Sequence, residues 1–430
     1  FDVVIVGSGY GGAVMAARLA RLRRADGARL RIAVLERGRE YVPGEFPNDL
    51  GMLPGAVRVD RADRSQPIGN PDALFHVHVD RDVCVLTGSA LGGTSQINAN
   101  VAIEAGDDVL RGPQWPRVFR ETPGLLDAHY AQARRTLGVV DYPGDVPKAR
   151  AFAAVAPHIE RRHLRDADPK RPIAGARLKR APLAVRFAAA DDASAPENPA
   201  GVAQKACIEC GDCVSGCNHW AKNTLTMNYL PLARRRGVRL FTGATVQHLR
   251  PDPEGGWIVT VDATVAETRP VRSARIDGGP MHLRAARVVL CAGALGSTEI
   301  LLRSRAVHAL SLSPRLGAGF STNGDMISAA YWQRDPVGAV GLGAAAGADP
   351  DPDAHAHRDT HVPTGSAAAR PRVGPTITSI VDLRDARVRE RRILIEDGAV
   401  PGALGDVFGE VLATAALLPQ RVRWKTQAQR

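Results

Sequence analysis

The first strong signal of the fold class is the stretch Phe1-Asp-Val-Val-Ile-Val-Gly-Ser-Gly-Tyr-Gly-Gly12. Its first six residues end in a β-branched apolar run, and its glycines repeat as Gly7-x-Gly9-x-x-Gly12. Residues 13–22 (AVMAARLARL) then have helical composition. Gly7 permits a tight turn, Gly9 lets the backbone approach a phosphate, and Gly12 allows the helix to pack closely on the strand. The stretch therefore predicts a strand, a glycine turn and a helix in that order.

A second strand completes the unit. Residues 30–35 (LRIAVL) form another apolar run, which ends at Glu36. In dinucleotide-binding units an acid after the second strand accepts a hydrogen bond from a ribose hydroxyl. The two strands, the turn and this acid together predict a dinucleotide site. The alternative is a glycine-rich turn that binds nothing.

Two later segments indicate that the nucleotide fold resumes further along the chain. Residues 87–101 (TGSALGGTSQINANV) form a second loop rich in glycine and small polar residues. Residues 287–302 (RVVLCAGALGSTEILL) repeat the order of strand, turn and helix. We therefore expect a nucleotide-binding fold assembled from separated segments.

Composition excludes several classes of protein. The 430 residues are 44% hydrophobic and 23% charged, as in ordinary globular chains, and no apolar run is long enough to span a bilayer. The net charge of +11 invites a nucleic-acid interpretation, but the arginines are scattered and aromatic residues are only 5%, too few to stack bases. We expect no nucleic-acid partner and no transmembrane segment. A basic surface also attracts anions or an acidic redox partner.

Four of the six cysteines lie within eleven residues, as Cys207-x2-Cys210-x2-Cys213-x3-Cys217. This spacing is that of bacterial ferredoxin loops, in which thiolates hold an iron-sulfur cluster. A single zinc ion suits widely separated cysteine pairs better. The alternatives are reduced structural thiols or a disulfide, and Cys217 is the least certain ligand because the fourth ferredoxin cysteine can serve another cluster. Clustered cysteines are unlike a secreted disulfide framework, so we expect a reducing, cytoplasmic compartment.

The motifs in their order resemble the GMC (glucose-methanol-choline) flavoprotein oxidoreductases, in particular a bacterial branch similar to cholesterol oxidases. The resemblance rests on "VVIVGSGYGGAVMAARLA", "GSALGGTSQINANV", "GATVQHL" and "VVLCAGALGSTEILL", and continues through "CIECGDCVSGCNHWAKNTLTMNYL", "GAGFSTNGD" and "GPTITSIVDLRD". It implies an α/β chain with a Rossmann-like FAD-binding domain built from discontinuous segments, plus an α+β substrate domain with an antiparallel sheet.

The resemblance also implies roles for single residues. Those expected at FAD are Gly7, Gly9, Gly11 and Gly12 at the pyrophosphate, Glu36 at the ribose, Gly92, Gly93, Thr94, Asn98 and Asn100 at the flavin, Val246 at the adenine through its backbone, and Ala292 and Gly293 close to the dinucleotide. Each has a structural alternative, since a glycine can serve a turn and an asparagine can cap a helix. The segment Ala221–Leu230 is expected to form a helix near the flavin domain.

Domain limits follow from the order of the motifs. Residues 1–110 and 200–310 are expected to form the FAD-binding domain, with the cysteine loop 207–217 inserted. Residues 111–199 are expected to cover the substrate cavity. Residues 311–430 are expected to form a substrate-binding domain that is incomplete at its C-terminal side. In this last part "TITSIVDL" and "RRILIED" predict paired strands, and "GDVFGEVLATAALL" predicts a helix.

The activity implied by the resemblance is oxidation of an alcohol to a ketone or aldehyde by hydride transfer to FAD. A sterol or another bulky apolar alcohol is the expected substrate, and oxygen or a protein the expected electron acceptor. The family's proton-accepting histidine, with its histidine or asparagine companion, has no counterpart up to Arg430, and the chain opens at Phe1 directly on a strand. We therefore expect a sequence that is truncated at both ends, with these residues beyond Arg430. The alternatives are an FAD dehydrogenase of a sugar or polyol, and a flavin or electron-transfer protein without catalysis.

The histidines that are present are not expected to bind a metal. His76 and His78 alternate in "LFHVHV", as on a strand face, and His355, His357 and His361 fall in a Gly-Ala-Asp-Pro-rich region, residues 337–374, that suits a mobile loop or disorder.

Overall fold

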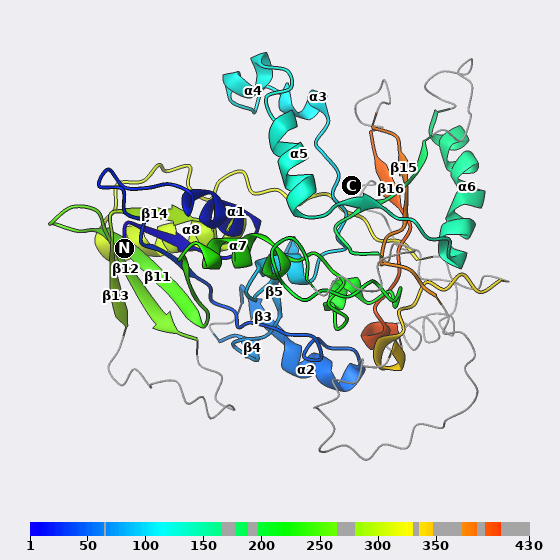
Figure 1. Cartoon of the computed structure of the whole chain (residues 1–430), viewed down its shortest axis with the longest axis horizontal. Coiled ribbons are helices and arrows are strands. Elements are labelled where there is room, and N and C mark those ends of the chain that lie inside the picture. Colours follow the sequence, from blue (N-terminus) through cyan, green and yellow to red (C-terminus); the bar gives the residue numbers. More distant parts are fainter. Residues whose placement is uncertain are drawn as a thin grey trace.

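A computed structural model describes residues 1–63, 66–164, 177–187, 197–264, 280–329, 335–346, 372–384 and 392–405 (Figure 1). All but the first residue of the helix predicted in residues 405–418, most of the loop 337–374 and the histidines at 355, 357 and 361 lie outside these ranges. Among the described helices, none is long and apolar enough to cross a membrane.

A parallel sheet forms the centre of the nucleotide fold. Its strands, in spatial order, are β10 (Arg239–Phe241), β2 (Ile32–Leu35), β1 (Val3–Val6) and β14 (Arg287–Leu290). All residues of β1 and β2 are buried, as expected for a parallel sheet covered on both faces. The strands come from two segments more than 200 residues apart in sequence, so the predicted Rossmann-like fold of discontinuous segments is confirmed.

Alternate residues of β1 and β2 enter two different cores. Val3, Ile5, Ile32 and Val34 pack with α1 (Tyr10–Leu19) and α7 (Tyr229–Arg235). Their neighbours in the strands face an antiparallel sheet and α8 (Gly293–His308). That sheet consists of β11 (Ala244–Pro251), β12 (Trp257–Ala263) and β13 (Met281–Ala285). The central sheet is thus the middle of three layers (Figure 1).

A mixed sheet follows the first βαβ unit. It contains β4 (Ile68–Gly69), β3 (Val57–Arg61), β5 (Phe75–Val79) and β6 (Cys84–Gly88) in that order, after η1 (Leu50–Met52) and α2 (Leu53–Ala56) and before η2 (Gly93–Gln96). Strands β3 and β5 are parallel and the outer pairs are antiparallel. The strand predicted at "LFHVHV" is confirmed as β5.

The rest of the molecule joins segments from the middle and the end of the chain. Strands β16 (Leu394–Glu396), β15 (Ser379–Asp382) and β8 (Leu178–Arg180) form an antiparallel sheet, so the predicted pairing of the two C-terminal strands is confirmed. The other elements here are α3 (Asp107–Leu110), α4 (Arg117–Glu121), α5 (Asp127–Thr136), β7 (Val140–Asp141), α6 (Pro147–Leu164), β9 (Pro182–Leu183), η3 (Cys213–Ser215), η4 (Leu225–Met227) and η5 (Gly343–Ala346). Because β8 belongs to the expected cover segment and β15 to the expected substrate domain, one sheet spans that division.

The helix expected over residues 221–230 is wrong in its position. Residues 221–224 are not helical, η4 follows, and α7 begins at Tyr229. Asn228 stands before α7 with φ −143°, outside helical geometry, and its side chain accepts a hydrogen bond from the Tyr229 N–H. The start of α7 therefore follows the capping residue.

Strand β11, at the edge of its sheet, contains an irregularity and is bonded to α8 beyond it. The register with β12 shifts between Val246 and His248, and the Leu249 N–H donates to the hydroxyl of Ser304 at 2.8 Å. Ser304 is fully buried. One side chain of α8 thus satisfies a backbone N–H of an edge strand.

We predict that Ser304→Ala lowers the free energy of unfolding by about 1–3 kcal/mol, because it leaves the buried Leu249 N–H without a partner. Urea denaturation followed by circular dichroism measures the change. Thr298→Ala, which removes an exposed hydroxyl from the same helix, is the control and is expected to stay within about 0.5 kcal/mol of wild type. Equal stabilities of the two variants would contradict the role of Ser304.

Candidate cofactor site and cysteine loop

The glycine turn after β1 is packed against the start of the late strand, turn and helix. Gly7 has φ +96°, and a Cβ there would lie 2.4 Å from the Cys291 carbonyl oxygen. A Cβ on Gly12 would lie 1.9 Å from the Gly7 carbonyl oxygen, so only glycine lets α1 approach the turn this closely. Ala292 and Gly293 begin α8 directly beside this turn.

Other glycines at the turn face open space. A Cβ on Gly9 or on Gly293 would meet nothing within 4 Å, and Gly11 is exposed. Gly9 stands at the N-terminal end of α1 with φ −63°, a conformation that any residue adopts. Sterics within the protein therefore do not require glycine at position 9, whereas close approach of a phosphate to the helix N-terminus would.

Glu36 is buried directly after β2 and accepts three hydrogen bonds. Its Oε2 accepts from the Ser8 N–H at 3.0 Å and from the Ser8 hydroxyl at 2.5 Å, and its Oε1 accepts from the Gly38 N–H at 2.9 Å. Burial raises the pKa of Glu36, and these donors oppose that rise. Both oxygens are held in place, and Oε1, which accepts one hydrogen bond, retains a lone pair for a further donor such as a ribose hydroxyl.

Ser8 also ties the second glycine loop to the first. Its Oγ accepts a hydrogen bond from the Gly92 N–H at 2.9 Å. Gly92 and Gly93 have φ +92° and +56°, and a Cβ on Gly93 would lie 2.9 Å from the Gly9 Cα. The two glycine loops, separated by more than 80 residues in sequence, are thus in direct contact.

The polar residues of the second loop extend along the same region. The Thr94 hydroxyl accepts from the Gly88 N–H, and the Asn98 amide donates to the Tyr10 hydroxyl at 2.8 Å. Asn100 is buried with φ +67°. Its Nδ2 has no hydrogen-bond partner among the described residues, as is also true of Arg37 Nη2, next to Glu36. Both nitrogens adjoin residues expected to hold FAD, so the region suits a polar ligand.

Val246 lies farther from the turns, in β11, and is buried. Its side chain shares a core cluster with Leu35 of β2 and has Ala292 packed against that cluster. Arg303 of α8 donates to the carbonyl oxygens of Gln247 at 2.8 Å and Val246 at 3.4 Å. The glycine turn, Glu36 and Ala292 thus follow the carboxyl ends of the neighbouring strands β1, β2 and β14, whereas Val246 lies in the layer on one face of that sheet. The contact of the predicted residues with FAD stays a prediction.

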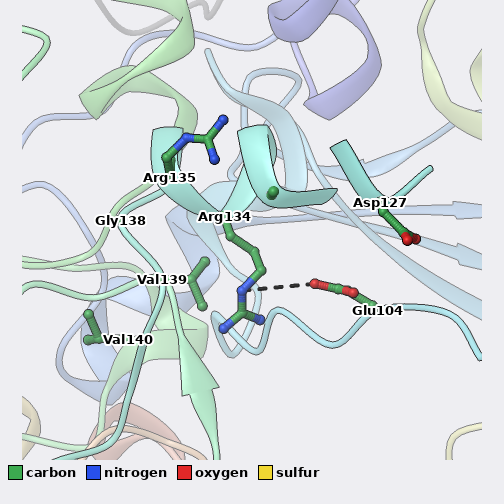
Figure 2. Close-up of a pocket in the computed structure, with 8 residues that line it drawn as sticks. Glu104, Asp127, Arg134, Arg135, Gly138, Val139 and Val140 are labelled. Atoms are coloured by element: carbon green, nitrogen blue, oxygen red, sulfur yellow. Dashed lines mark ion pairs between the residues drawn. The ribbon is translucent and has the colours of Figure 1, made fainter. Parts of the chain in front are cut away.

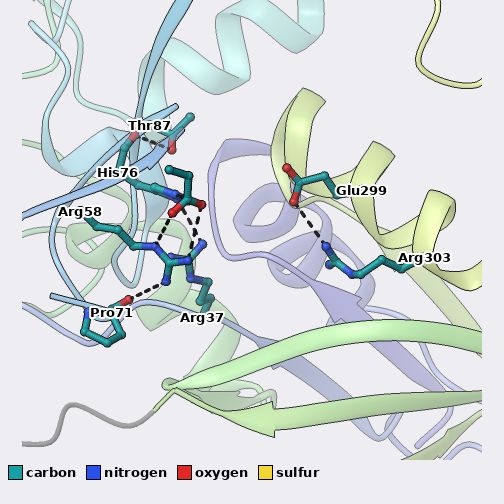
Figure 3. A network of polar contacts seen from close by, with 8 residues as sticks. Arg37, Arg58, Pro71, His76, Thr87, Glu299 and Arg303 are labelled. Atoms are coloured by element: carbon teal, nitrogen blue, oxygen red, sulfur yellow. Dashed lines mark hydrogen bonds and ion pairs between the residues drawn. The ribbon is translucent and has the colours of Figure 1, made fainter. Parts of the chain in front are cut away.

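A polar network adjoins Glu36 through Arg37 (Figure 3). Arg37 contacts Nδ1 of His76 at 3.2 Å, and Nε2 of His76 contacts the Asp60 carboxylate at 2.7 Å. Burial, with the charges of Arg37 and His78, lowers the pKa of His76 to about 4, so the ring is neutral. Ligand atoms of Asp60, His76 and His78 lie within 4.8 Å of one another. However, Arg58 contacts the Asp60 carboxylate and Arg37 contacts the His76 ring, and these positive charges oppose binding of a cation.

A hollow of about 480 Å³ lies elsewhere, beside α5 (Figure 2). Arg134 reaches across it toward Glu104 at 3.9 Å, and both side chains are well exposed. None of the predicted site residues lines this hollow.

The four clustered cysteines converge on one small cavity. The walls of this cavity include Cys207, Cys210, Cys213 and Cys217, and none of them is in a disulfide. Among the described residues, the sulfurs of these cysteines do not form a group whose ligand atoms all lie within 4.8 Å of one another, as those of Asp60, His76 and His78 do. This spacing does not favour a single tetrahedral ion.

Backbone donors point at three of the sulfurs. The Glu209 N–H donates to Cys207 Sγ at 3.3 Å, and N–H groups of Asp212 and Thr376 face the sulfurs of Cys210 and Cys213. Glu209 reaches its position with φ +60°, which is uncommon for a residue other than glycine. Hydrogen bonds of this kind stabilise negative charge on sulfur and tune bound clusters.

Charge around the loop is buried. Burial raises the pKa of Cys207, Cys210 and Cys213, and it lowers the pKa of Lys222 to about 8, while thiolates at Cys213 and Cys217 would raise it. Neutral thiols are therefore the stable form of the empty loop, and a bound cation would be needed to hold them as thiolates.

Comparison with known proteins assigns the family. Residues 1–322 match the family described as GMC oxidoreductase. This chain belongs to the GMC oxidoreductases. The resemblance inferred from the motifs is thereby confirmed.

Individual relatives agree with this assignment. A cholesterol oxidase of Mycobacterium tuberculosis is 31% identical over 342 residues, which are 77% of this chain and 52% of that protein. A cholesterol oxidase of Acinetobacter baumannii is 25% identical over 343 residues, 76% of this chain and 55% of that protein. The chain thus spans about half the length of the curated relatives it matches.

Among solved structures, pyridoxine 4-oxidase from Mesorbium loti overlaps with a TM-score of 0.39 at 17% identity, over 70% of this chain and 51% of that chain. A fungal aryl-alcohol oxidase overlaps with a TM-score of 0.40 at 15% identity, over 71% and 47%. These similarities are too low to bear on the substrate.

Sequence reasoning missed three residues of this GMC oxidoreductase. Ser8 lies between two glycines of the turn. Gly38 packs against the backbone of Ser89 and Ala90, where a Cβ on residue 38 would lie 2.3 Å from backbone atoms. Lys222 is buried between the cysteine loop and the second glycine loop. The glycine at position 38 carried a signal as a turn residue, whereas nothing local marks Ser8 or Lys222.

We predict that Gly9→Ala folds normally but binds FAD about tenfold more weakly or worse, because its Cβ has space only in the absence of the pyrophosphate and overpacking costs about 1–3 kcal/mol. FAD retained per chain and the unfolding midpoint measure the two effects. Gly55→Ala in α2, where a Cβ also meets open space, is the matched control. Normal FAD content in the Gly9→Ala variant would contradict the prediction that the pyrophosphate binds at this turn.

Proposed function

We propose that this chain is the FAD-binding part, with a portion of the substrate-binding part, of an oxidoreductase that oxidises the CH–OH group of a bulky apolar alcohol, foremost a sterol. The observation that carries the proposal is the junction at Ser8. One side chain joins the pyrophosphate turn, the ribose carboxylate and the second glycine loop in a member of the GMC family. The names of the listed cholesterol oxidases support the sterol as substrate.

The chain's residues fit FAD. In this proposal Gly7, Gly9, Gly11 and Gly12 contact the pyrophosphate, Glu36 the ribose, the Val246 backbone the adenine, and Gly92, Gly93, Thr94, Asn98 and Asn100 the flavin, with Ala292 and Gly293 beside the dinucleotide. FAD, when bound, supplies the acceptor for the hydride that leaves the alcohol carbon. The chain's part is to bind and orient: Glu36 is held rigid by its donors, and Asn98 is held by Tyr10. The acceptor of the hydroxyl proton is not assigned to any residue up to Arg430.

We further propose that Cys207, Cys210, Cys213 and Cys217 hold an iron-sulfur cluster. Support comes from four unpaired cysteines at one cavity and from backbone N–H groups directed at their sulfurs. Such a cluster supplies one-electron transfer, so the electrons taken from the alcohol would leave toward a protein acceptor rather than only toward oxygen. Free thiols and a cluster suit a reducing, cytoplasmic compartment. A sterol substrate would give the protein a role in steroid or other lipid metabolism.

We predict that the full-length protein, kept anaerobic, bleaches its flavin absorption on addition of cholesterol and not on addition of glucose. A stopped-flow spectrometer measures the bleaching, and reduction by dithionite is the control for a functional flavin. Bleaching by sugars or polyols alone would favour a polar-substrate dehydrogenase. Flavin that dithionite reduces but no alcohol reduces would favour a non-catalytic flavoprotein.

We predict about four iron and four sulfide per FAD in protein purified without oxygen, as expected for a [4Fe–4S] cluster. Cys210→Ser is expected to lose most of this iron, whereas Cys84→Ser, an exposed cysteine in β6, keeps it. Iron and sulfide analysis with electron paramagnetic resonance of the reduced protein gives the result. Wild-type protein with FAD and no iron would overturn the cluster and leave the alcohol oxidation standing.

A further inference from the structure

We propose that Lys222 is a positioning residue that supplies the positive charge for electron transfer between the cysteine loop and the flavin loop. This inference rests on the proposed FAD and iron-sulfur cluster. It assigns to one lysine the control of how readily an electron moves from reduced flavin to the cluster.

Lys222 bridges the two loops through its ammonium group. Its Nζ donates to the carbonyl oxygen of Cys213 at 2.9 Å in the cysteine loop. It also donates to the carbonyl oxygens of Gln96 at 2.9 Å and Asn98 at 2.7 Å, in the segment expected to line the flavin. The three donors of an ammonium are thus all used. One side chain fixes the distance between a proposed cluster ligand and the proposed flavin site.

The charge of this ammonium has no carboxylate partner among the described residues. Lys222 is 3% exposed, and its electrostatic partners in this part of the chain are the sulfurs of Cys213 and Cys217. Lys148, also buried, interacts with the Cys213 sulfur as well, but the Asp397 carboxylate 3.3 Å from its Nζ offsets its charge. An unpaired buried cation is costly, so the site is suited to an anionic occupant.

A cluster ligated by four thiolates is such an occupant. Each added electron makes it more negative, and a nearby positive charge in a site of low polarity stabilises the reduced form more than the oxidised form. Lys222 therefore raises the reduction potential of the cluster. In the proposed step one electron leaves reduced flavin and enters the oxidised cluster, and Lys222 favours that direction.

The test compares Lys222→Met and Lys222→Gln, which remove the charge, with Lys222→Arg, which keeps it. Anaerobic titrations of full-length protein, followed by absorption for the flavin and by electron paramagnetic resonance for the cluster, give both potentials. We expect the equilibrium constant for electron transfer from flavin to cluster to fall about tenfold or more in the neutral variants, the scale of one buried charge interaction. The arginine variant is expected to remain near wild type.

Lys205→Met is the matched control, because it removes an exposed positive charge two residues before Cys207, where solvent screens it. Neutral Lys222 variants that keep iron and FAD with wild-type potentials would overturn the inference. If they lose iron while Lys222→Arg keeps it, the charge is needed to hold the anionic cluster, which supports the inference. If the arginine variant loses iron as well, Lys222 only packs the loops and the inference fails. Wild-type protein without iron refutes the proposed cluster itself, a separate result.

Discussion

The hydrogen bond between Ser8 and Glu36 is the interaction on which the candidate cofactor site depends. It is buried, and its donor hydroxyl accepts in turn from the Gly92 N–H. The bond therefore fixes the carboxylate after β2 and the second glycine loop relative to the turn after β1. A buried carboxylate without such donors would be neutral or displaced, because burial disfavours its charge. The same donors that keep Glu36 in place make it a rigid acceptor.

Around this bond the backbone segments approach so closely that side chains are excluded. The carbonyl oxygen of Gly7 lies against Gly12, the Cα of Gly9 against Gly93, and the Ser89–Ala90 peptide against Gly38. Each contact would bring a Cβ within 3 Å of backbone, which real structures do not tolerate. The glycines thus serve assembly at positions 7, 12, 38 and 93, while Gly9 leaves the space that a phosphate would take.

The two buried lysines of the described chain differ in the groups that surround their ammonium charge. Lys148 pairs with Asp397 and so stabilises the junction between α6 and the C-terminal strands. Lys222 has carbonyl oxygens and thiols around it instead. The first arrangement is complete within the protein. In the second, the hydrogen bonds of the ammonium are complete but its charge has no carboxylate partner among the described residues, which is the basis of the proposed link between the two loops.

Sequence patterns alone predict the βαβ unit, the late return of the chain to the sheet, the pairing of β15 with β16 and the convergence of the four cysteines. These features depend on short-range patterns: β-branched runs, glycine spacing, alternation and cysteine spacing. No sequence pattern predicts that Ser8 joins Glu36 to Gly92, that α7 starts at Tyr229 after the segment carrying Lys222, or that Arg37 contacts His76. Those contacts join residues 28 to 126 positions apart, or depend on a single capping side chain, and hydrogen bonds at such separation leave no periodic trace in a sequence.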